Sequence, residues 1–512
     1  MASVRGWWVV PSSVAIFILA IDACPPARMG HAAPESEKKS AAAPADRWVG
    51  QSVLAKNPDA KLRERPDLAA KEIAWSPGTL RCEVKAVDAD WLRFSHGWLL
   101  ARDAIRQADA MDYFNGVIDQ RATDFAYVSR ALLYVLEARA ERAIADCNAA
   151  ISLNPASSGA YYNRALAQTI KWRSDLAFED FNVAIRLKPD EPTAYRCRGD
   201  IFQRREQFAD AAENYRRAIE RGLREPALYL QSGSMKSKLG DFDGAIDDYT
   251  QSIRLDPTQA EAYMRRGFAL MSKNEFPKAI DDCNLAIERD PRDYLSHCNR
   301  AVCRAVLGDP SKALDDLTRA ILLHPEYSQA YGNRGALLLE LKRYTEARAD
   351  LDTQISINPT PLAFSNRGSL RLMMGDYAGA LTDFEIALRQ NPRQESALVG
   401  QATIWSRCPL EQLRDVPRAI QSAERACQLA AWADPQAIFA LAAAKAELGD
   451  FKQALELVQR VPELLRKPDT RFRDDSLQKT VTEMTNAFRE NKPYRRLEVS
   501  SQDEERTHDD GR

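Results

Sequence analysis

The spacing of apolar and polar residues changes along the chain and divides it into three parts. An apolar run from Val14 to Ile21 lies close to the first residue and follows the basic residue Arg5. From Trp48 to about Ala104, apolar and polar residues alternate with a period near two, which is typical of short strands. Beyond this point the apolar residues recur at helical spacing. The pattern therefore predicts a small all-β module followed by a mainly α region.

The helical region repeats itself every 34 residues. A mostly small residue followed by a ring marks each unit, the last after a one-residue deletion: Ala126-Tyr127, Ala160-Tyr161, Ala194-Tyr195, Leu228-Tyr229, Ala262-Tyr263, Ser296-His297, Ala330-Tyr331 and Ala363-Phe364. Four residues after each ring comes Ala or Gly, which lets two helices approach closely. Seven of the eight units end in proline, which stops a helix, and Leu223 replaces it in the third.

These residues resemble the tetratricopeptide repeat (TPR) family over residues 124–396. The resemblance implies a right-handed α-solenoid of eight helical hairpins, in which the first helix of each pair lines a concave face that contacts extended peptides. Residues 397–466 look like a divergent pair of repeats, and residues 105–123 are expected to form a helix that caps the other end. A C-terminal helix and a disordered tail are expected over residues 467–512.

The alternating segment is predicted to be a β domain over residues 47–104. Its order of short motifs, which includes Val49-Gly50, Asp90-Trp91-Leu92 and Gly97-Trp98-Leu99, resembles that of bacterial SH3-like domains. Two roles for Trp91 and Trp98 remain open. They either line an aromatic groove for Pro-rich or cell-wall peptides, or fill the core of the small barrel.

The N-terminal residues 1–33 have the charge-then-apolar layout of a secretory signal. Three outcomes are open: cleavage near His31-Ala32-Ala33, lipid attachment at Cys24, or an uncleaved membrane anchor. Residues 34–46 are small, charged and Pro-punctuated, which predicts a flexible, disordered linker. We therefore expect an exported bacterial protein of the periplasm or cell envelope, with a tether to the membrane as one alternative.

Charge and cysteine content narrow the choices further. The 71 Lys and Arg residues nearly balance the 73 Asp and Glu residues without long blocks of one sign, which argues against nucleic-acid partners. Nine cysteines would permit disulfides in an exported protein. However, Cys147 and Cys283 fall at core positions of the repeat, and Cys427 would lie roughly 16 Å along a helix from the turn near Cys408. Buried thiols are therefore predicted.

A search for catalytic and metal-binding patterns finds none that is convincing. The five histidines are scattered, and no local nucleophile, zinc or phosphate-loop motif occurs. His297, Cys298 and Cys303 are close in sequence, but residues five apart on a helix point about 140° apart, and His297 takes the ring position of its repeat. No catalytic residue, metal ligand or cofactor is therefore predicted.

Polar residues recur inside the predicted first helices and have two interpretations. Arginines follow the ring by three residues in most units, and asparagines precede them in several. The arginines either face a ligand or pair with acidic residues of the second helix, such as Asp248, Asp282 or Asp316. The asparagines either face a ligand, as proposed for Asn299, Asn333 and Asn366, or hydrogen-bond along the array. The residues that the TPR resemblance would require for a two-carboxylate clamp are absent.

Two patches are the strongest binding candidates. Arg196, Asp200 and Arg204 form a polar patch, and Met264, Phe268 and Met271 form an apolar one two repeats later. We expect a partner segment with an apolar anchor and an acidic flank to bind between residues 196 and 271.

The sequence thus favours a non-enzymatic scaffold for a protein or peptide partner. The alternatives are a peptidoglycan-binding protein that acts through the SH3-like domain, with the repeats as recruiter, and a helper subunit of an enzyme complex or an enzyme without a recognisable motif.

Overall fold

The computed structural model of the chain describes residues 49–73, 82–88, 91–94, 97–101, 104–465, 475–495 and 497. The predicted export signal with Cys24 and the predicted linker over 34–46 lie outside the described residues, as do residues 498–512. The side chains of Trp91 and Trp98 also lie outside them, so both roles considered for these rings stay predictions.

The alternating segment forms short antiparallel strands in two sheets. One sheet has the order β4-β1-β8 and the other β3-β2-β7-β6-β5. The strands are β1 (Ser52–Ala55), β2 (Leu62–Arg63), β3 (Glu72–Ile73), β4 (Cys82–Glu83), β5 (Ala86–Asp88), β6 (Trp91–Phe94), β7 (Gly97–Leu100) and β8 (Ala104–Arg106). The SH3-like barrel predicted for this segment stays a prediction.

Strand β1 connects the sheets to the helices because its residues alternate between two cores. Val53 and Ala55 pack with Leu62, Leu92 and other strand residues. Leu54 points into a second cluster that includes Phe114. Phe114 belongs to helix α1 (Gln107–Gln120), so β1 is covered on both faces and the β segment packs directly on the start of the helical array.

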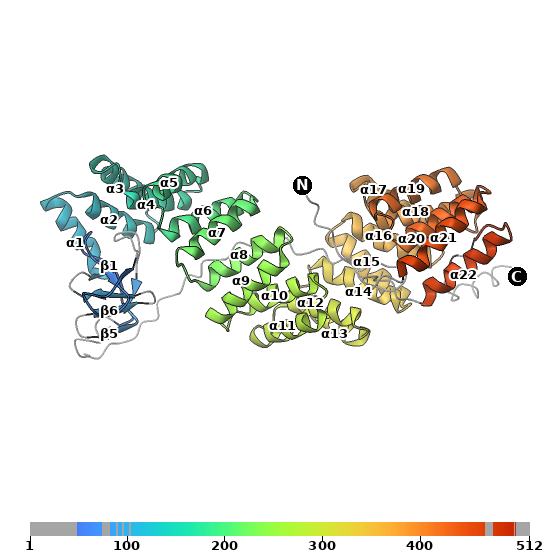
Figure 1. The fold of residues 1–512 in the computed structure, drawn as a ribbon, viewed down its shortest axis with the longest axis horizontal. Coiled ribbons are helices and arrows are strands. Elements are labelled where there is room, and N and C mark those ends of the chain that lie inside the picture. The colour runs from blue at the N-terminus through green and yellow to red at the C-terminus, as the bar shows by residue number, and fades with distance from the viewer. Residues whose placement is uncertain are drawn as a thin grey trace. The chain divides into compact units, whose positions relative to one another are not determined.

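The described residues then contain ten helical hairpins, α2 to α21, which confirms the prediction of a mainly α repeat array (Figure 1). The first helix of every hairpin has 13 residues: α2 (Asp124–Leu136), α4 (Ser158–Ile170), α6 (Pro192–Arg204), α8 (Pro226–Lys238), α10 (Ala260–Ser272), α12 (Tyr294–Val306), α14 (Ser328–Glu340), α16 (Pro361–Met373), α18 (Glu395–Arg407) and α20 (Pro435–Glu447).

The second helices follow after short turns: α3 (Ala140–Leu153), α5 (Ser174–Leu187), α7 (Phe208–Glu220), α9 (Phe242–Leu255), α11 (Phe276–Arg289), α13 (Pro310–Leu323), α15 (Tyr344–Ile357), α17 (Tyr377–Gln390), α19 (Val416–Leu429) and α21 (Phe451–Leu465). A short 3-10 helix, η2 (Glu411–Leu413), fills the insertion before α19, and α22 (Asp475–Arg489) follows the last hairpin.

The small residue after each ring allows the two helices of a hairpin to approach closely. A Cβ atom added at Gly199 would lie 2.7 Å from the Tyr215 ring, and one at Gly368 would lie 2.6 Å from the Phe384 ring. Real Cβ atoms do not approach this closely, so these positions require glycine while the opposing ring stays in place. Small-to-large exchange here is expected to cost about 1–3 kcal/mol.

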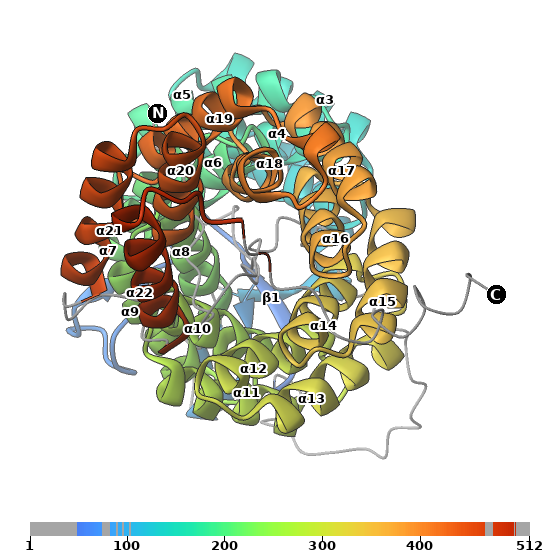
Figure 2. The same ribbon diagram turned by 90° about the vertical axis from the view of Figure 1, so that its right-hand side faces the viewer.

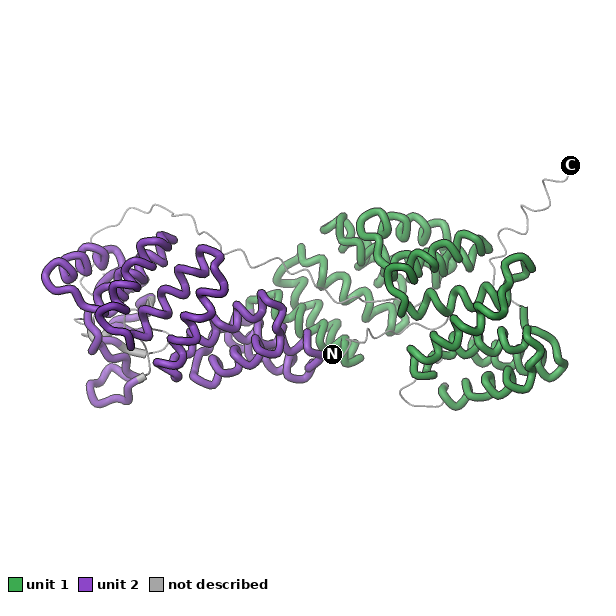
Figure 3. The backbone as a smooth tube through the Cα atoms, turned by 90° about the horizontal axis from the view of Figure 1, so that it is seen from above, with its two compact units in different colours: residues 1–26, 258–512 green, residues 27–257 purple. Residues whose placement is uncertain are grey.

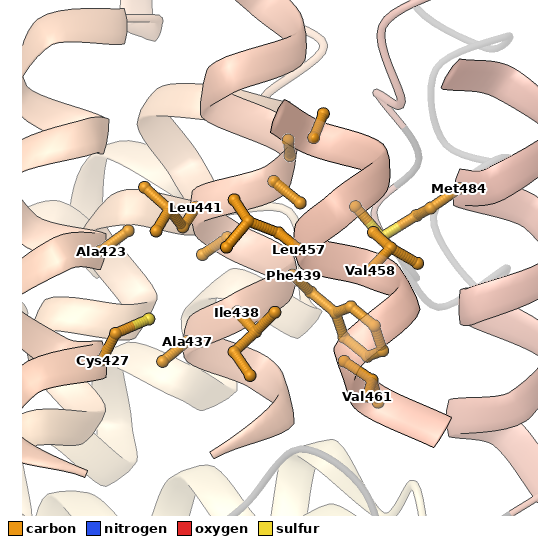
Figure 4. Close-up of a cluster of buried hydrophobic side chains, with 14 of the residues drawn as sticks. Ala423, Cys427, Ala437, Ile438, Phe439, Leu441, Leu457, Val458, Val461 and Met484 are labelled. Carbon is orange, nitrogen blue, oxygen red and sulfur yellow. The ribbon is translucent and has the colours of Figure 1, made fainter. Parts of the chain in front are cut away.

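The described chain divides into two compact units, residues 49–257 and residues from 258 onward, shown in different colours in Figure 3. Within the second unit, α14, α16 and α18 lie on the inner side of the curved helical layer, and α15, α17 and α19 lie on its outer side (Figure 2). The largest apolar cluster of this unit gathers Phe439, Val458, Met484 and neighbouring residues of α19 to α22 (Figure 4). This cluster gives the C-terminal end of the array a core of its own.

The turns inside the hairpins share one backbone conformation. The residue after the first helix's cap has a positive φ in each of nine hairpins: Ala138, Trp172, Glu206, Gly240, Asn274, Gly308, Lys342, Gly375 and Gly449. At Gly240 the N–H donates to the Ser237 carbonyl, and the next N–H, of Asp241, donates to the Lys236 carbonyl. This is the Schellman arrangement, for which glycine is the preferred residue. Five of these nine turns use a residue with a side chain instead.

Candidate binding surfaces

The recurring arginines lie at the seventh position of the first helices and pair with the seventh residue of the second helix. In the hairpin of α4 and α5, Arg164 Nε and Nη2 donate to the two carboxylate oxygens of Asp180 at 2.8 and 2.7 Å. The same two-point pair joins Arg130 to Asp146, Arg266 to Asp282, Arg300 to Asp316, Arg334 to Asp350 and Arg367 to Asp383. The interpretation that the arginines pair with acidic residues is therefore confirmed, and we call this set the arginine ladder.

Four ladder guanidinium groups, those of Arg164, Arg300, Arg334 and Arg367, also reach the second helix of the hairpin before their own. Arg164 Nη1 donates to Asn148 Oδ1 of α3 at 2.8 Å, and Arg334 Nη1 donates to Thr318 Oγ1 of α13 at 3.1 Å. Arg164 further lies over the ring of Tyr161, 5.3 Å from its centre. One side chain thus holds its own hairpin and the preceding one together, which is a structural role.

The helix α1 takes part in this arrangement although it is not half of a hairpin. Arg130 Nη1 donates to Asn115 Oδ1 of α1 at 3.0 Å, as those four ladder arginines do to a preceding second helix. The helix expected to cap the array at residues 105–123 thus presents the same contact as a repeat.

The ladder is interrupted at two neighbouring hairpins of the first unit. Arg198 faces the neutral Asn214, whose Oδ1 accepts from Arg198 Nε at 2.9 Å. Burial lowers the pKa of Arg198, since no carboxylate compensates for the lost hydration. In the next hairpin Ser232 replaces the arginine and donates to Asp248 at 2.6 Å. Lys236 supplies the positive charge for Asp248, at 2.7 Å.

The ladder ends before the last two hairpins. Gln401 and Ser422 take the places of the arginine and the aspartate in α18 and α19, and the buried Leu441 and Leu457 take them in α20 and α21. A pocket of about 520 Å³ opens where the shorter polar pair stands, lined by Leu388, Pro392, Leu398, Gln401, Gln421, Ser422, Glu424, Arg425 and Gln428. The ladder side chains therefore fill space as well as pair charges.

The predicted polar patch lies on one helix, α6, and is largely paired within the protein. Arg196 Nη1 lies 3.6 Å from Asp200 Oδ2, and Arg196 Nε lies 4.0 Å from Glu225 Oε2. The Tyr215 hydroxyl lies 2.9 Å from Asp200 Oδ1, a contact that the sequence analysis missed because Tyr215 occupies a core position of its repeat. Arg204 is exposed and donates from Nε to the Asp200 carbonyl.

Two features make this patch able to bind an anion. The Nε of Arg196 is buried and has no hydrogen-bond acceptor among the described residues. Burial raises the pKa of the Asp200 carboxyl, whereas Arg196 and the hydroxyl of Tyr215 lower it. An acidic group of a ligand placed beside Arg196 would supply the acceptor that Nε lacks.

The predicted apolar patch lies on α10 and offers one accessible side chain. Met264 and Met271 are 7% and 4% exposed and belong to the protein's own packing. Phe268 is partly exposed, at the ninth position of the helix, where α6 carries Asp200. Phe268 is therefore the residue of this set that can contact a partner.

In two hairpins the asparagines hydrogen-bond along the array, which is one of the two interpretations considered for them. Asn163 Nδ2 donates to the Val128 carbonyl of the preceding first helix at 2.9 Å, and Asn333 Nδ2 contacts Cys298 Sγ at 3.8 Å. Asn299 and Asn366 are both 6% exposed. The Nδ2 of Asn299 is buried and has no acceptor among the described residues.

Glu340, the last residue of α14, was not singled out by the sequence. Its Oε1 is buried without a hydrogen-bond partner in the described part of the chain. Burial raises the pKa of this carboxyl from 4.5 to about 8. Only the position within the repeat could have pointed to Glu340. It is the thirteenth residue of its first helix, as the candidate residue Arg204 is in α6.

No catalytic or metal centre emerges from the described residues. The seven cysteines whose side chains the structure describes are free and buried, which confirms the prediction of buried thiols for them. Burial raises the pKa of Cys298 and Cys303 to about 12, so neither is an activated nucleophile. Within the described ranges, no group of three or more His, Cys, Asp or Glu residues could hold a metal ion.

None of the helices that the structure describes combines the length and the apolar character needed to cross a bilayer.

Comparison with known protein families supports the repeat assignment. Models of the tetratricopeptide repeat match residues 126–157, 260–293, 304–358 and 366–435, and a further TPR repeat model matches residues 233–273. No curated protein matches the sequence.

Several solved TPR structures are similar to parts of the chain. YrrB, a TPR protein with an unusual peptide-binding site, is 22% identical, with a TM-score of 0.35, over 38% of this chain and 97% of YrrB. Yeast Tom70 is 16% identical, with a TM-score of 0.40, over 75% of this chain and 92% of Tom70. A tetratricopeptide repeat protein from Parabacteroides merdae is 19% identical, with a TM-score of 0.42, over 47% and 96% of the two chains. The assignment of the repeats rests on the family models and on the internal period.

Proposed function

We propose that the protein is a non-enzymatic scaffold that binds extended protein segments along the first helices of its hairpins. The TPR repeats support a role in protein–protein interaction, and proteins built from them are generally scaffolds without catalytic activity. The observation that carries the proposal is the buried, unsatisfied Nε of Arg196, on the helix that also carries the exposed Arg204. A donor of this kind costs free energy until a ligand supplies its acceptor.

The two patches contribute different chemistry, and each acts within its own unit. The patch on α6 is proposed to take an acidic side chain, because Nε of Arg196 lacks a hydrogen-bond acceptor among the described residues and Arg204 is exposed. The patch on α10 takes an apolar side chain against the partly exposed Phe268. An acidic side chain of a partner is therefore proposed at α6, and an apolar side chain of a partner at α10.

Site-specific crosslinking in cells tests this proposal. A photoreactive residue is placed at Arg204, at Phe268 or, as control, at the exposed Arg216 of the second helix α7. Partners are expected to crosslink from the first two positions and not from Arg216. A recovered partner is then retained by the wild-type chain and lost, by at least tenfold, on combined Arg196→Glu and Phe268→Asp exchange.

The charge reversal Arg216→Glu is the matched control, because it changes an exposed arginine outside the first helices. It should leave partner retention unchanged. Retention that survives the Arg196→Glu, Phe268→Asp pair in a folded protein contradicts the proposal.

Export and cell-wall binding are proposed as well, on the sequence pattern alone. Fractionation of cells separates a periplasmic or envelope protein from the other compartments. Sedimentation of residues 46–105 with purified cell-wall sacculi tests the alternative function of the SH3-like segment.

A further inference from the structure

The chain after α22 turns back at a well-formed helix end. Asn491 has a positive φ of 51°. Its N–H donates to the Phe488 carbonyl at 3.1 Å, and the N–H of Lys492 donates to the Ala487 carbonyl at 2.9 Å. This Schellman arrangement closes the helix, and Pro493 prevents it from continuing. The cap therefore directs the following residues away from the helix axis.

Tyr494 is the first of three contacts that this segment makes with other helices. Its hydroxyl donates to Glu483 Oε2 of α22 at 2.7 Å. The guanidinium of Arg407, the last residue of α18, lies 5.0 Å from the centre of the ring. A cation over an aromatic face at this distance is attracted to it, so the ring is held from two sides.

Arg495 makes the second contact, with the last residue of α20. Its Nε and Nη2 donate to the two carboxylate oxygens of Glu447 at 2.6 and 2.9 Å. The Glu447 side chain is only 7% exposed, whereas that of Arg495 is 48% exposed. The hydrogen bonds to Glu447 raise the pKa of Arg495. A shielded carboxylate thus holds a basic side chain that arrives from solvent.

Leu497 makes the third contact. It packs against an apolar cluster that contains Phe384 of α17 and Ile404 of α18. Three side chains of this segment, one aromatic, one basic and one aliphatic, thus each contact a complementary surface of the helices.

The helix residues that receive Tyr494 and Arg495 occupy a repeated position. Arg407 and Glu447 are the thirteenth residues of consecutive first helices, as Arg204 is in α6. The C-terminal segment therefore lies across the same positions that we propose for partner binding in an earlier hairpin.

We propose that Tyr494, Arg495 and Leu497 act as an intramolecular ligand of the last hairpins, and that an external segment with aromatic, basic and aliphatic side chains in the same order binds there by displacing them. The inference rests on the proposed function, of which it names one partner class. A tethered segment competes at an effective concentration in the millimolar range, so the chain's own segment sets a threshold that a partner must exceed.

A labelled synthetic peptide of residues 488–500 tests the inference on the full chain. Its binding is measured by fluorescence anisotropy to wild type, to the double variant Tyr494→Ala, Arg495→Ala, and to the same variant with Glu447→Gln added. The double variant should bind the peptide at least tenfold more tightly than wild type, because its own segment no longer competes. Adding Glu447→Gln should reverse this gain, because the peptide's arginine loses its carboxylate.

Lys492→Ala is the matched control, since Lys492 lies in the same segment and pairs only with the neighbouring Glu490 among the salt bridges of the described residues. It should bind the peptide like wild type. Equal affinity of the peptide for wild type and the double variant overturns the inference. The inference also fails if the double variant does not bind the peptide although hydrogen exchange shows that α20 to α22 remain folded. In either case the segment only packs against the end of the array. Neither result affects the crosslinks at Arg204 and Phe268, so the two proposals fail separately.

Discussion

Arg164 and Arg198 occupy the same place in consecutive hairpins but face different partners. Both stack on the ring three residues earlier and reach an asparagine of the preceding second helix. Arg164 pairs with the carboxylate of Asp180, whereas Arg198 meets the amide of Asn214. The two positions therefore separate the effect of the ion pair from that of packing and stacking.

Replacing Arg164 by alanine should cost about 3 kcal/mol of local stability, because Asp180 stays buried without its counterion. The matched change Arg198→Ala should cost about 1 kcal/mol, since it leaves a neutral amide. Amide hydrogen exchange of α4 to α7 measures both, because hairpins of a repeat array open locally.

The exchange Asn214→Asp would supply the missing carboxylate. It should slow amide hydrogen exchange in α6 and α7, because an ion pair with the new carboxylate would then compensate for the burial of Arg198. Equal losses for the two alanine variants would mean that the ion pair adds nothing to packing.

Glu340 links stability to pH. The unfolded carboxyl titrates near 4.5 and the folded one near 8. Between these values the folded state keeps a proton that the unfolded state loses, so stability falls as pH rises through this window. Glu340→Gln should remove this contribution and flatten the decline. Urea unfolding at pH 5 and pH 8 measures it, and an unchanged pH dependence in the variant would contradict the assignment.

At the scale of elements, the hairpin turns place side chains where the backbone favours glycine. Lys342 has a φ of 57°, and Gly308 takes the same turn position one hairpin earlier with a φ of 82°. A residue with a Cβ atom in the left-handed conformation destabilises the folded state by roughly 1–2 kcal/mol. Glycine avoids this strain, but its greater freedom in the unfolded chain offsets part of the gain in stability.

Lys342→Gly should therefore stabilise the protein by about 0.5 kcal/mol. Gly308→Ala should destabilise it by about 1 kcal/mol through backbone strain alone, because an added Cβ would meet no atom within 4 Å. Thermal unfolding of both variants checks the pair. The same sign for both changes would refute the argument.

The sequence predicted the helical elements better than the surfaces. Its 34-residue period follows from rings, small residues and prolines that pack in every hairpin, so one rule applies repeatedly. The pairing of Asp200 with Tyr215 could not be read in this way, because each residue has a different role in its own helix. The contacts of Tyr494 and Arg495 were missed for a related reason: they occur once, join helices far apart in sequence, and follow no period.

At the scale of the whole molecule, cohesion between hairpins depends more on where the arginine ladder is interrupted than on any single ion pair of the ladder. Most of its guanidinium groups cross from one hairpin to the one before, and this crossing is missing at Ser232 in the first unit and at Gln401 and Leu441 in the second. Hairpins on either side of these positions rely on apolar packing and loops for their cohesion.

Under a stretching load this uneven cross-linking would divide each unit into stiff and compliant stretches. Shear between hairpins is resisted by the ladder's directional bonds along most of the array, and these bonds are missing at α8, α18 and α20. A pulled chain should therefore yield first at these helices. The repeat that makes the protein regular would then also set where it gives way.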